Sequence, residues 1–265
     1  LYPGMIQRQT RVLKSISSHY HRQFKTLHLS GGVAYGDRAP SVSEGFGFYL
    51  FNSFDNHDYI GNPDLKNEKA FEANIKMAWP IKNLDITVEG NYFHTWDYII
   101  GEIDPELDVM TIGADGVKVY TNLEYANLYN VSLDMVYQLT SELDWSGLVS
   151  YHRGTDQNGR NLPFISPLAY RSRLTYGHGN FSGTLTLSGA LDQSDFSPDF
   201  GEDRTPAYTL LSLSLGKSFS IGGDALYAKV GIENIFDRYY STYSDWNNIP
   251  RMGRNFFMTL SYAIN

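Results

Sequence analysis

Short segments in which apolar and polar residues alternate recur along nearly the whole chain. In residues 84–92, for example, Leu84, Ile86 and Val88 alternate with Asp85, Thr87 and Glu89. A period of two places successive side chains on opposite faces of an extended strand. The pattern therefore predicts an all-β chain of about eleven strands. The predicted strands are 26–35, 71–79, 84–92, 129–139, 143–152, 170–176, 181–191, 211–215, 226–233 and 256–264, with a weaker candidate at 8–20.

The lengths of the strands and of their connections separate two kinds of β protein. Most of the segments have the length of about 9–11 residues that a tilted strand needs to cross a bilayer. Aromatic residues make up 15% of the chain, and several stand at strand ends, as in the aromatic girdles of outer-membrane barrels. Connections alternate between short ones, at 80–83, 140–142, 177–180 and 221–224, and long ones, at 37–67, 101–122, 153–167, 192–205 and 237–253.

Short turns on one side and long loops on the other are typical of transmembrane β-barrels, whereas a soluble sandwich has no reason to sort its loops by length. We therefore predict an antiparallel transmembrane β-barrel with its C-terminus on the periplasmic side. The polar strand faces should then line the lumen, because a charge on the lipid face costs roughly 2–4 kcal/mol near the midplane. A solvated strand face explains any single one of these charges equally well. The charges concerned are Glu72, Lys76, Asp85, Glu89, Asp134, Asp144, Arg171, Arg173, Lys229 and Glu233.

Composition excludes several other classes. The chain has no Cys, which rules out disulfides and thiolate-bound metals. Its formal net charge of -8 argues against a nucleic-acid-binding protein. A membrane-spanning helix needs a run of roughly 20 apolar residues, and the sequence contains no such run. The first residues lack the apolar stretch of a signal peptide; because a barrel of the outer membrane must be exported, we expect the chain to begin within a longer protein.

Four segments, in this order, resemble the TonB-dependent receptors of Gram-negative bacteria. The first is the run Arg38-Ala39-Pro40-Ser41 with Glu44 after it, and the second is the segment 61–68, which contains Asn62 and Pro63 and is similar to the family's "NPDLKPE". The third, 233–240, contains Asn234 and Asp237 and is similar to "ENLFDRxY". The fourth contains Gly253 and Arg254 and leads into the last strand, where Ile264 stands in place of the family's usual terminal aromatic residue.

The resemblance implies a 22-stranded barrel whose lumen is filled by a plug domain. The predicted strands make about half of such a barrel, and so residues 1–265 are interpreted as its C-terminal part, without the plug domain. Since an open sheet edge is not tolerated in a membrane, the missing strands should belong to the same protein. The resemblance also implies partners: outer-membrane lipid, the protein's own N-terminal plug domain, the TonB–ExbB–ExbD complex, and a nutrient ligand.

No catalytic, cofactor or metal motif stands out, and no enzyme activity is predicted. His19 and His21 lie close together but at a predicted turn. Residues of the predicted extracellular loops are candidates for ligand contact, although solvated loops or interface anchors explain them too. They are His57 and Asp58 in the first long loop, His152 and Arg153 at a strand end, Arg204, and the aromatic residues Tyr243 and Trp246.

From the resemblance we expect an active transporter in the outer membrane. It would bind an iron–siderophore-type metal chelate at its loops and plug and import it with energy from TonB. Import of copper, cobalamin, haem or a glycan is an alternative cargo within the same mechanism. A passive porin, which has the same strand pattern but no plug, is an alternative of another class, as are an enzyme at the barrel rim and a soluble sandwich.

Overall fold

The computed structural model describes residues 10–264, except for the side chain of Trp246, and the fold is almost entirely β. Its only α-helix in that range is the short α1 (Val42–Phe46), and two 3-10 turns occupy Pro198–Phe200 and Trp246–Asn248. The strands are β1 (Ser15–Gln23), β2 (His28–Arg38), β3 (Leu50–Asn52), β4 (His57–Ile60), β5 (Glu68–Ile81), β6 (Leu84–Ile103), β7 (Gly116–Gln138), β8 (Leu143–Asp156), β9 (Ala169–His178), β10 (Phe181–Ala190), β11 (Tyr208–Ile221), β12 (Asp224–Glu233) and β13 (Asn255–Ala263).

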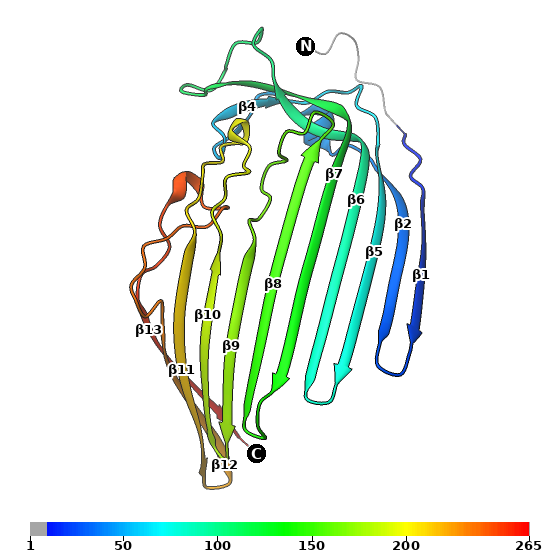
Figure 1. Cartoon of the computed structure of the whole chain (residues 1–265). Coiled ribbons are helices and arrows are strands. Elements are labelled where there is room, and N and C mark those ends of the chain that lie inside the picture. Colours follow the sequence, from blue (N-terminus) through cyan, green and yellow to red (C-terminus); the bar gives the residue numbers. More distant parts are fainter. Residues whose placement is uncertain (1–9, 265) are drawn as a thin grey trace.

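Eleven of these strands form one curved antiparallel sheet in chain order, β1-β2-β5-β6-β7-β8-β9-β10-β11-β12-β13. Each strand pairs with the next along this path, and within the described residues β1 and β13 have a neighbour on one side only. Figure 1 shows the sheet bent into an open trough. The predicted fold class, a barrel wall of about eleven strands, is thus confirmed, and the wall does not close in this part of the chain.

Short and long connections are sorted to opposite ends of the sheet. Tight turns join β1 to β2, β5 to β6, β7 to β8, β9 to β10 and β11 to β12, and all of them lie at the lower end in Figure 1 together with the C-terminal end of the chain. The long connections, 39–67, 104–115, 157–168, 191–207 and 234–254, all lie at the upper end. Positive φ angles at Lys82, Gly179, Gly222 and Gly223 fit the two-residue hairpin turns.

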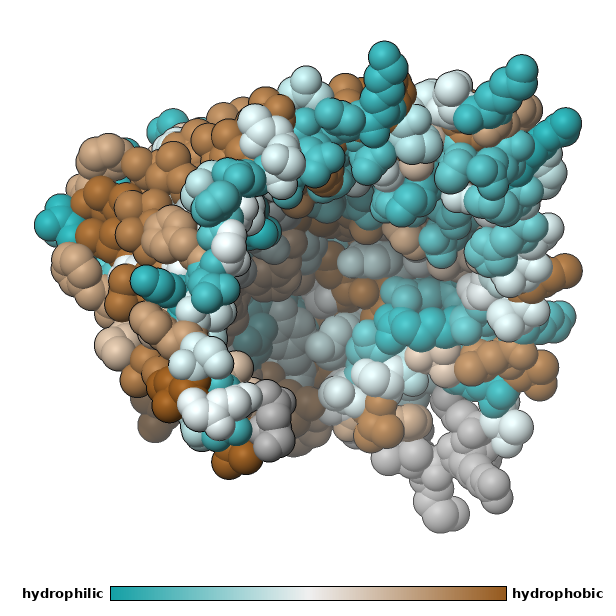
Figure 2. All heavy atoms as spheres, turned by 90° about the horizontal axis from the view of Figure 1, so that it is seen from below, coloured by the Kyte–Doolittle hydropathy of each residue, from teal (hydrophilic) through white to brown (hydrophobic). Residues whose placement is uncertain are grey.

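The two faces of the sheet differ in chemistry as the alternation predicts. In β13, Phe256, Met258, Leu260 and Tyr262 are between 54% and 73% exposed in the isolated chain, and they share a face with Val230 of β12. The opposite face carries Lys76 and Glu89, which pair across β5 and β6 with 2.5 Å between Nζ and Oε1. Seen from the turn end, Figure 2 shows a hollow with a largely hydrophilic wall and hydrophobic residues gathered on the outer side. Apolar side chains pointing outward are what a bilayer requires.

Several predicted boundaries were wrong. Strands β6 and β7 have 20 and 23 residues, so they extend beyond a bilayer and shorten the loop expected at 101–122 to residues 104–115. The first strand begins at Ser15 and continues to Gln23, which places His19 and His21 inside β1 and not at a turn. The part of the weak candidate 8–20 before residue 10 lies outside the described residues. No helix of the described range is long and apolar enough to cross a membrane.

The first long loop contains secondary structure that the alternation did not predict. Strands β3 and β4 form a small hairpin, and β4 then adds in parallel to the first residues of β7, with His57 opposite Gly116. The most buried apolar side chains of the described range gather at this loop end, among them Tyr59, Ile60, Leu65, Val117 and Leu123. The packed core of the described residues therefore lies at the loop end, between the first long loop and the upper ends of β6 and β7.

Candidate functional site

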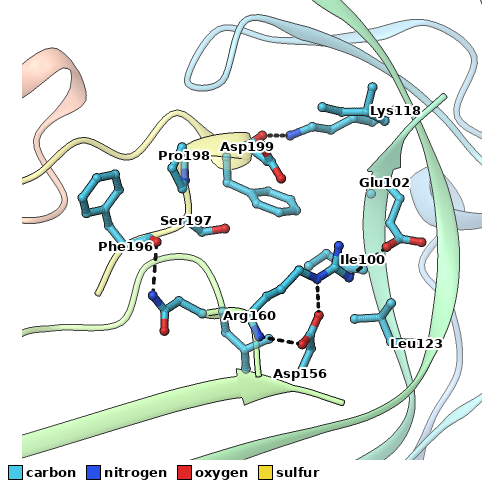
Figure 3. Close-up of a pocket in the computed structure, with 15 residues that line it drawn as sticks. Ile100, Glu102, Lys118, Leu123, Asp156, Arg160, Phe196, Ser197, Pro198 and Asp199 are labelled. Atoms are coloured by element: carbon cyan, nitrogen blue, oxygen red, sulfur yellow. Dashed lines mark hydrogen bonds and ion pairs between the residues drawn. The ribbon is translucent and has the colours of Figure 1, made fainter. Parts of the chain in front are cut away.

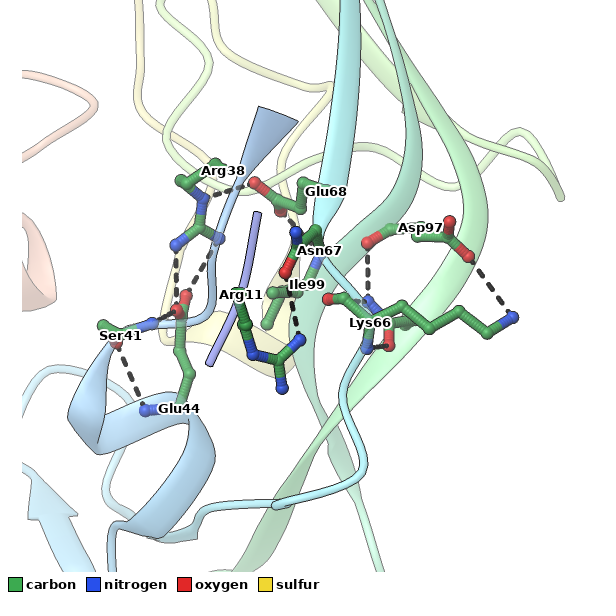
Figure 4. Close-up of polar contacts among 10 residues, drawn as sticks. Arg11, Arg38, Ser41, Glu44, Lys66, Asn67, Glu68, Asp97 and Ile99 are labelled. Atoms are coloured by element: carbon green, nitrogen blue, oxygen red, sulfur yellow. Dashed lines mark hydrogen bonds and ion pairs between the residues drawn. The ribbon is translucent and has the colours of Figure 1, made fainter. Parts of the chain in front are cut away.

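The loops at the upper end of the trough are held by ionic clusters, and the first surrounds Arg38. Its Nη1 and Nη2 donate to both carboxylate oxygens of Glu44, at 2.8 and 3.1 Å, and its Nε donates to Glu68 at 2.5 Å (Figure 4). Glu44 also completes a capping box with Ser41 at the start of α1. Partial burial works to raise the pKa of Glu44, but hydrogen bonds from Arg38 and Ser41 outweigh it, so that this pKa is lowered.

The second motif segment packs directly against the first. The Gly61 amide donates to the Gly47 carbonyl at 2.7 Å, and the Asn62 amide donates to the Glu44 carbonyl at 2.8 Å. A Cβ atom on Gly61 would lie 2.5 Å from the backbone nitrogens of Phe46 and Gly47, so only Gly fits there. Pro40 directly precedes the N-cap Ser41, and Pro63 follows Asn62 in the adjacent turn. The two motifs, separated in sequence, thus form one structural unit around α1.

The third and fourth motif segments also interlock. Asn234, which is buried, accepts a hydrogen bond from the Arg238 amide and donates one to its carbonyl, both at 2.8 Å. Asp237 accepts from the Arg254 amide at 2.7 Å, and Arg254 Nε donates to the Ile235 carbonyl at 2.8 Å. A side chain at Gly253 would collide with the Asp237 carboxylate. These residues tie the loop between β12 and β13 to the strand ends, which gives them a structural role.

A buried lysine joins three separate parts of the loop layer. Lys118, on β7, is fully buried, and its Nζ lies 2.6 Å from the equally buried Asp55 carboxylate. Its Nζ also donates to the Asp199 carbonyl and lies 4.0 Å from the centre of the Phe200 ring. Burial lowers the pKa of Lys118 below its ordinary value, while Asp55 opposes that shift. This Lys118 cluster therefore fastens the 39–67 loop and the 191–207 loop to the end of β7.

A cleft of about 460 Å³ opens beside the Lys118 cluster (Figure 3). It is bounded by the ends of β6 and β7, by residues after β8 and by the segment Phe196–Phe200. Its main charged group is the Arg160 guanidinium, which bridges Asp156 at 2.6 Å and Glu102 at 3.0 Å. Behind it, Glu202 accepts hydrogen bonds from the Ser197 and Phe164 amides, and its burial raises the pKa of that carboxyl above its ordinary value. The cleft combines polar and apolar side chains, and the charges of Arg160, Asp156 and Glu102 are paired with one another.

The structure separates the predicted ligand-contact residues. Asp58 is fully buried, and its carboxylate accepts hydrogen bonds from the Met110 and Thr111 amides at 2.9 Å, so it holds the 104–115 loop. His57, half-buried, contacts the Asp55 carbonyl. His152 bonds Asn130 on the lumen face, whereas Arg153 lies opposite Tyr129 on the other face and pairs with Asp195.

The remaining candidates lie farther along the loop layer. Arg204 is exposed and pairs with Asp192 at 3.0 Å. Tyr243 is half-buried in the loop between β12 and β13, and the side chain of Trp246 lies outside the described residues. No single pocket thus unites the predicted set. Lys118, Asp156 and Arg160 were not predicted, because each stands in ordinary strand or loop sequence and only the meeting of distant loops brings them together.

Within residues 10–264, no group of three or more His, Asp or Glu residues is placed to hold a metal ion. What this end of the molecule offers is a set of braced, polar, concave loop surfaces above a hydrophilic trough.

The family model described as TonB dependent receptor-like, beta-barrel matches residues 19–235. The chain belongs to the TonB-dependent receptor family. This family consists of transport receptors of the Gram-negative outer membrane and not of enzymes. The first two motif segments named from the sequence lie within the matched residues, the third begins at their end, and the fourth lies beyond them.

Solved structures agree with this assignment at the level of the fold. The copper transporter OprC is 20% identical over 94% of this chain and 39% of that protein, with a TM-score of 0.78. The siderophore receptor PirA from Acinetobacter baumannii is 15% identical over 94% of this chain and 41% of its own, with a TM-score of 0.72. A mutant of the ferric enterobactin receptor PfeA from Pseudomonas aeruginosa is 15% identical over 95% of this chain and 40% of its own, with a TM-score of 0.70. The receptor chain thus spans about two fifths of their lengths. No curated protein matches the sequence.

Proposed function

We propose that this chain is the C-terminal part of the barrel of an outer-membrane receptor that imports a metal chelate of the iron–siderophore type. The observation that carries the proposal is membership of the TonB-dependent receptor family over residues 19–235. The loop layer supports it, because the cleft beside Arg160 is concave and combines apolar side chains with a few polar groups, as ligand sites do. The chelate binds at these loops and at the apex of a plug domain.

The rest of the mechanism belongs to the whole receptor. The barrel wall is fixed in lipid, the plug fills the lumen, and the TonB–ExbB–ExbD complex delivers energy from the inner membrane to move the plug. The chain itself does no covalent chemistry. Its loops bind the solute, and the hydrophilic trough provides the path into the periplasm (Figure 2). His57, His152, Arg153, Arg204, Tyr243 and Trp246 remain our candidates for contact with the chelate.

Copper is a second candidate cargo, supported by the TM-score of 0.78 with a copper transporter. Against copper as a bare ion, the described residues contain no group of three His, Asp or Glu residues placed to hold a metal ion. A chelated metal needs no such cluster, because the chelator supplies the ligands and the receptor recognises its outer surface. A chelate of iron or of copper is therefore favoured over a bare copper ion as the cargo.

The test is growth of a strain lacking the receptor on a panel of ferric chelates, copper, cobalamin, haem and glycans as limiting nutrients. We expect growth to fail on one ferric chelate and to return when the full-length receptor is supplied in trans. A receptor with its TonB-contacting segment deleted is the control, and it should restore nothing. Unchanged growth of the deletion strain on every source would refute import, and complementation that does not need the TonB-contacting segment would favour a passive porin.

A further inference from the structure

A hollow lies where β8 and β9 separate at the upper end of the wall, and Figure 1 shows β8 continuing above the end of β9. The two strands pair as far as Ser150 and Ala169, although β8 continues for six more residues, to Asp156. The connection returns to β8 at Leu162, whose amide donates to the Gly154 carbonyl at 3.1 Å. β8 spans the interval with three residues and the connection with six, so the surplus residues bulge away from β8. They leave a hollow of about 210 Å³ between β8, the connection and the end of β10.

The hollow opens on the outer face of the wall and is covered on the lumen face. Gly154 stands two residues after His152, which bonds Asn130 on the lumen face, so a side chain at either position points to that face. A Cβ on Gly154 would lie 2.8 Å from Ile165, which therefore covers the hollow on this side. β8 to β10 stand inside the sheet with wall strands on both sides, so the strands that complete the barrel join elsewhere.

The outer lining of the hollow is largely apolar. Tyr151 lies opposite Val131 on the lipid face. Leu191 continues the outward-facing row of β10 and is 51% exposed in the isolated chain. Pro167 and Leu168, from the connection, complete this lining. Removing apolar surface from water favours contact with a hydrocarbon chain, so the hollow suits the upper part of an acyl chain.

Aromatic rings on the same face place the hollow at the membrane boundary. Tyr92 and Tyr129 stack on the outer face of β6 and β7 with ring centres 4.9 Å apart, and Tyr129 lies opposite Arg153 at the rim of the hollow. Beside them, His94 and Tyr125 stack with ring centres 5.2 Å apart. Rings of this kind occupy the membrane interfaces of outer-membrane barrels. The hollow therefore lies at the depth where lipid headgroups meet acyl chains.

Arg153 supplies a cation at the rim of the hollow. Its guanidinium pairs with Asp195, and the two side chains are 33% and 61% exposed. An exposed ion pair contributes little to stability, and a phosphate offers more charge and more acceptor oxygens than a carboxylate, so a phosphate can replace Asp195. Asp192, the other carboxylate that lines the hollow, is neutralised by Arg204 at 3.0 Å.

We propose that this hollow binds a phosphorylated glycolipid of the outer leaflet, with one acyl chain between Tyr151 and Leu191 and a phosphate on Arg153. The long loops at this end face the outside, so the lipid that reaches the hollow is the anionic glycolipid of the outer leaflet and not the phospholipid of the periplasmic one. A lipid held there also covers the interval in which the pairing of β8 and β9 has ended. The proposal takes Arg153 out of the candidates for contact with the imported chelate, because this side chain faces the membrane.

The test uses the purified full-length receptor in detergent and native mass spectrometry, with lipid A as the probe and phosphatidylethanolamine as the comparison. We expect saturable binding of lipid A, at least about tenfold tighter than that of phosphatidylethanolamine. R153Q should weaken lipid A binding roughly tenfold, because a charge-assisted hydrogen bond is lost. D195N should strengthen it, because Arg153 is then available to the phosphate. If the ion pair only held the loop in place, both variants would change lipid binding in the same direction.

Two further variants locate the site. L191S removes apolar lining from the hollow and should also weaken lipid A binding. The matched control R22Q removes an outward-facing arginine at the turn end of β1, beside Phe24, and should leave the binding unchanged. Retained β-sheet circular dichroism and resistance to detergent denaturation at room temperature check that each variant is folded.

Several outcomes would overturn the proposal. R153Q might bind lipid A as the wild type does, D195N might lose binding as R153Q does, or the wild type might bind phosphatidylethanolamine as tightly as lipid A. A loss in R22Q as large as that in R153Q would show that lipid A is attracted by charge alone and not held in the hollow.

Discussion

The buried Lys118 cluster allows one prediction to be worked out in detail. Replacing Lys118 by Met removes the ammonium group and leaves the Asp55 carboxylate, 1% exposed, without its cation. Breaking a buried ion pair by removing one partner costs roughly 3–5 kcal/mol, because the other charge stays buried. Tyr59 still donates to Asp55 at 2.5 Å, which places the expected cost at the lower end, about 3 kcal/mol.

The loss should appear locally, since Lys118 connects loops and not the barrel wall. Amide hydrogen exchange of the full-length receptor measures it, because exchange reports the free energy of local opening. A cost of about 3 kcal/mol corresponds to roughly a hundredfold faster exchange. We expect this acceleration in β4 and around Asp199, and no change in β9 or β10.

Two further variants make the reasoning refutable. K118M/D55N removes both charges and should recover much of the protection against amide exchange that K118M loses. Replacing both partners of a buried ion pair is often nearly neutral in stability. K76M breaks the Lys76–Glu89 pair, whose side chains are about half exposed, and should cost at most about 1 kcal/mol. Exchange in K118M as slow as in the wild type, or a double variant no better than the single one, would show that Lys118 is not the link between the loops.

Four other predictions follow from the same structure. R38K should destabilise the folded 39–67 loop by about 1–2 kcal/mol, because an ammonium cannot make the bidentate contact to Glu44 while also reaching Glu68. The loss should appear as faster proteolysis of this loop, and cleavage no faster than in the wild type would contradict it. The pKa of Asp58 is lowered because hydrogen bonds from Thr111 and Met110 outweigh its burial, so its contribution is complete above the ordinary carboxyl pKa of about 3.9 and is lost as the pH falls through the lowered value. Acid should therefore open the 104–115 loop in the wild type, and in D58N the protection of this loop, taken relative to the intrinsic exchange rate at each pH, should fall less with acid than in the wild type. V131R, on the lipid face, should cost about 2–4 kcal/mol in barrel assembly, whereas S132R, next to it on the lumen face, should cost little; equal yields of folded receptor would refute the assigned faces. G61A should destabilise the unit around α1, since its methyl group meets backbone atoms at 2.5 Å, and an unchanged melting temperature would show that α1 shifts freely.

The barrel wall was predictable from the sequence because each wall strand carries its own alternating pattern. Lipid on one side and water on the other act on every residue of β9 or β13 separately, so a local pattern suffices. The extent of β6 and β7 was not predictable, because above the membrane their outer faces no longer need to be apolar.

The loop layer shows why the candidate site was harder to predict. Lys118 stands in the run Val117-Lys118-Val119, which has the same pattern as any half-exposed strand, and nothing local reveals that Asp55 will cover it. Asp58 follows a His in a long loop and was a candidate for ligand contact, yet its carboxylate accepts hydrogen bonds from two backbone amides of another loop. The motif residues Arg38 and Asn234 were recognised from the resemblance, but their bracing role depends on contacts between segments distant in the sequence.

The parallel pairing of β4 with β7 also sets an order of events during assembly. Every wall strand pairs with the next wall strand along the chain, and the pairs joined by tight turns close short loops at low entropic cost. β4 must wait, because its partner residues in β7 are synthesised later and lie beyond two further wall strands, β5 and β6. We therefore expect the 39–67 loop to acquire its structure only after β5, β6 and β7 have paired with one another and brought the partner residues of β4 close to it.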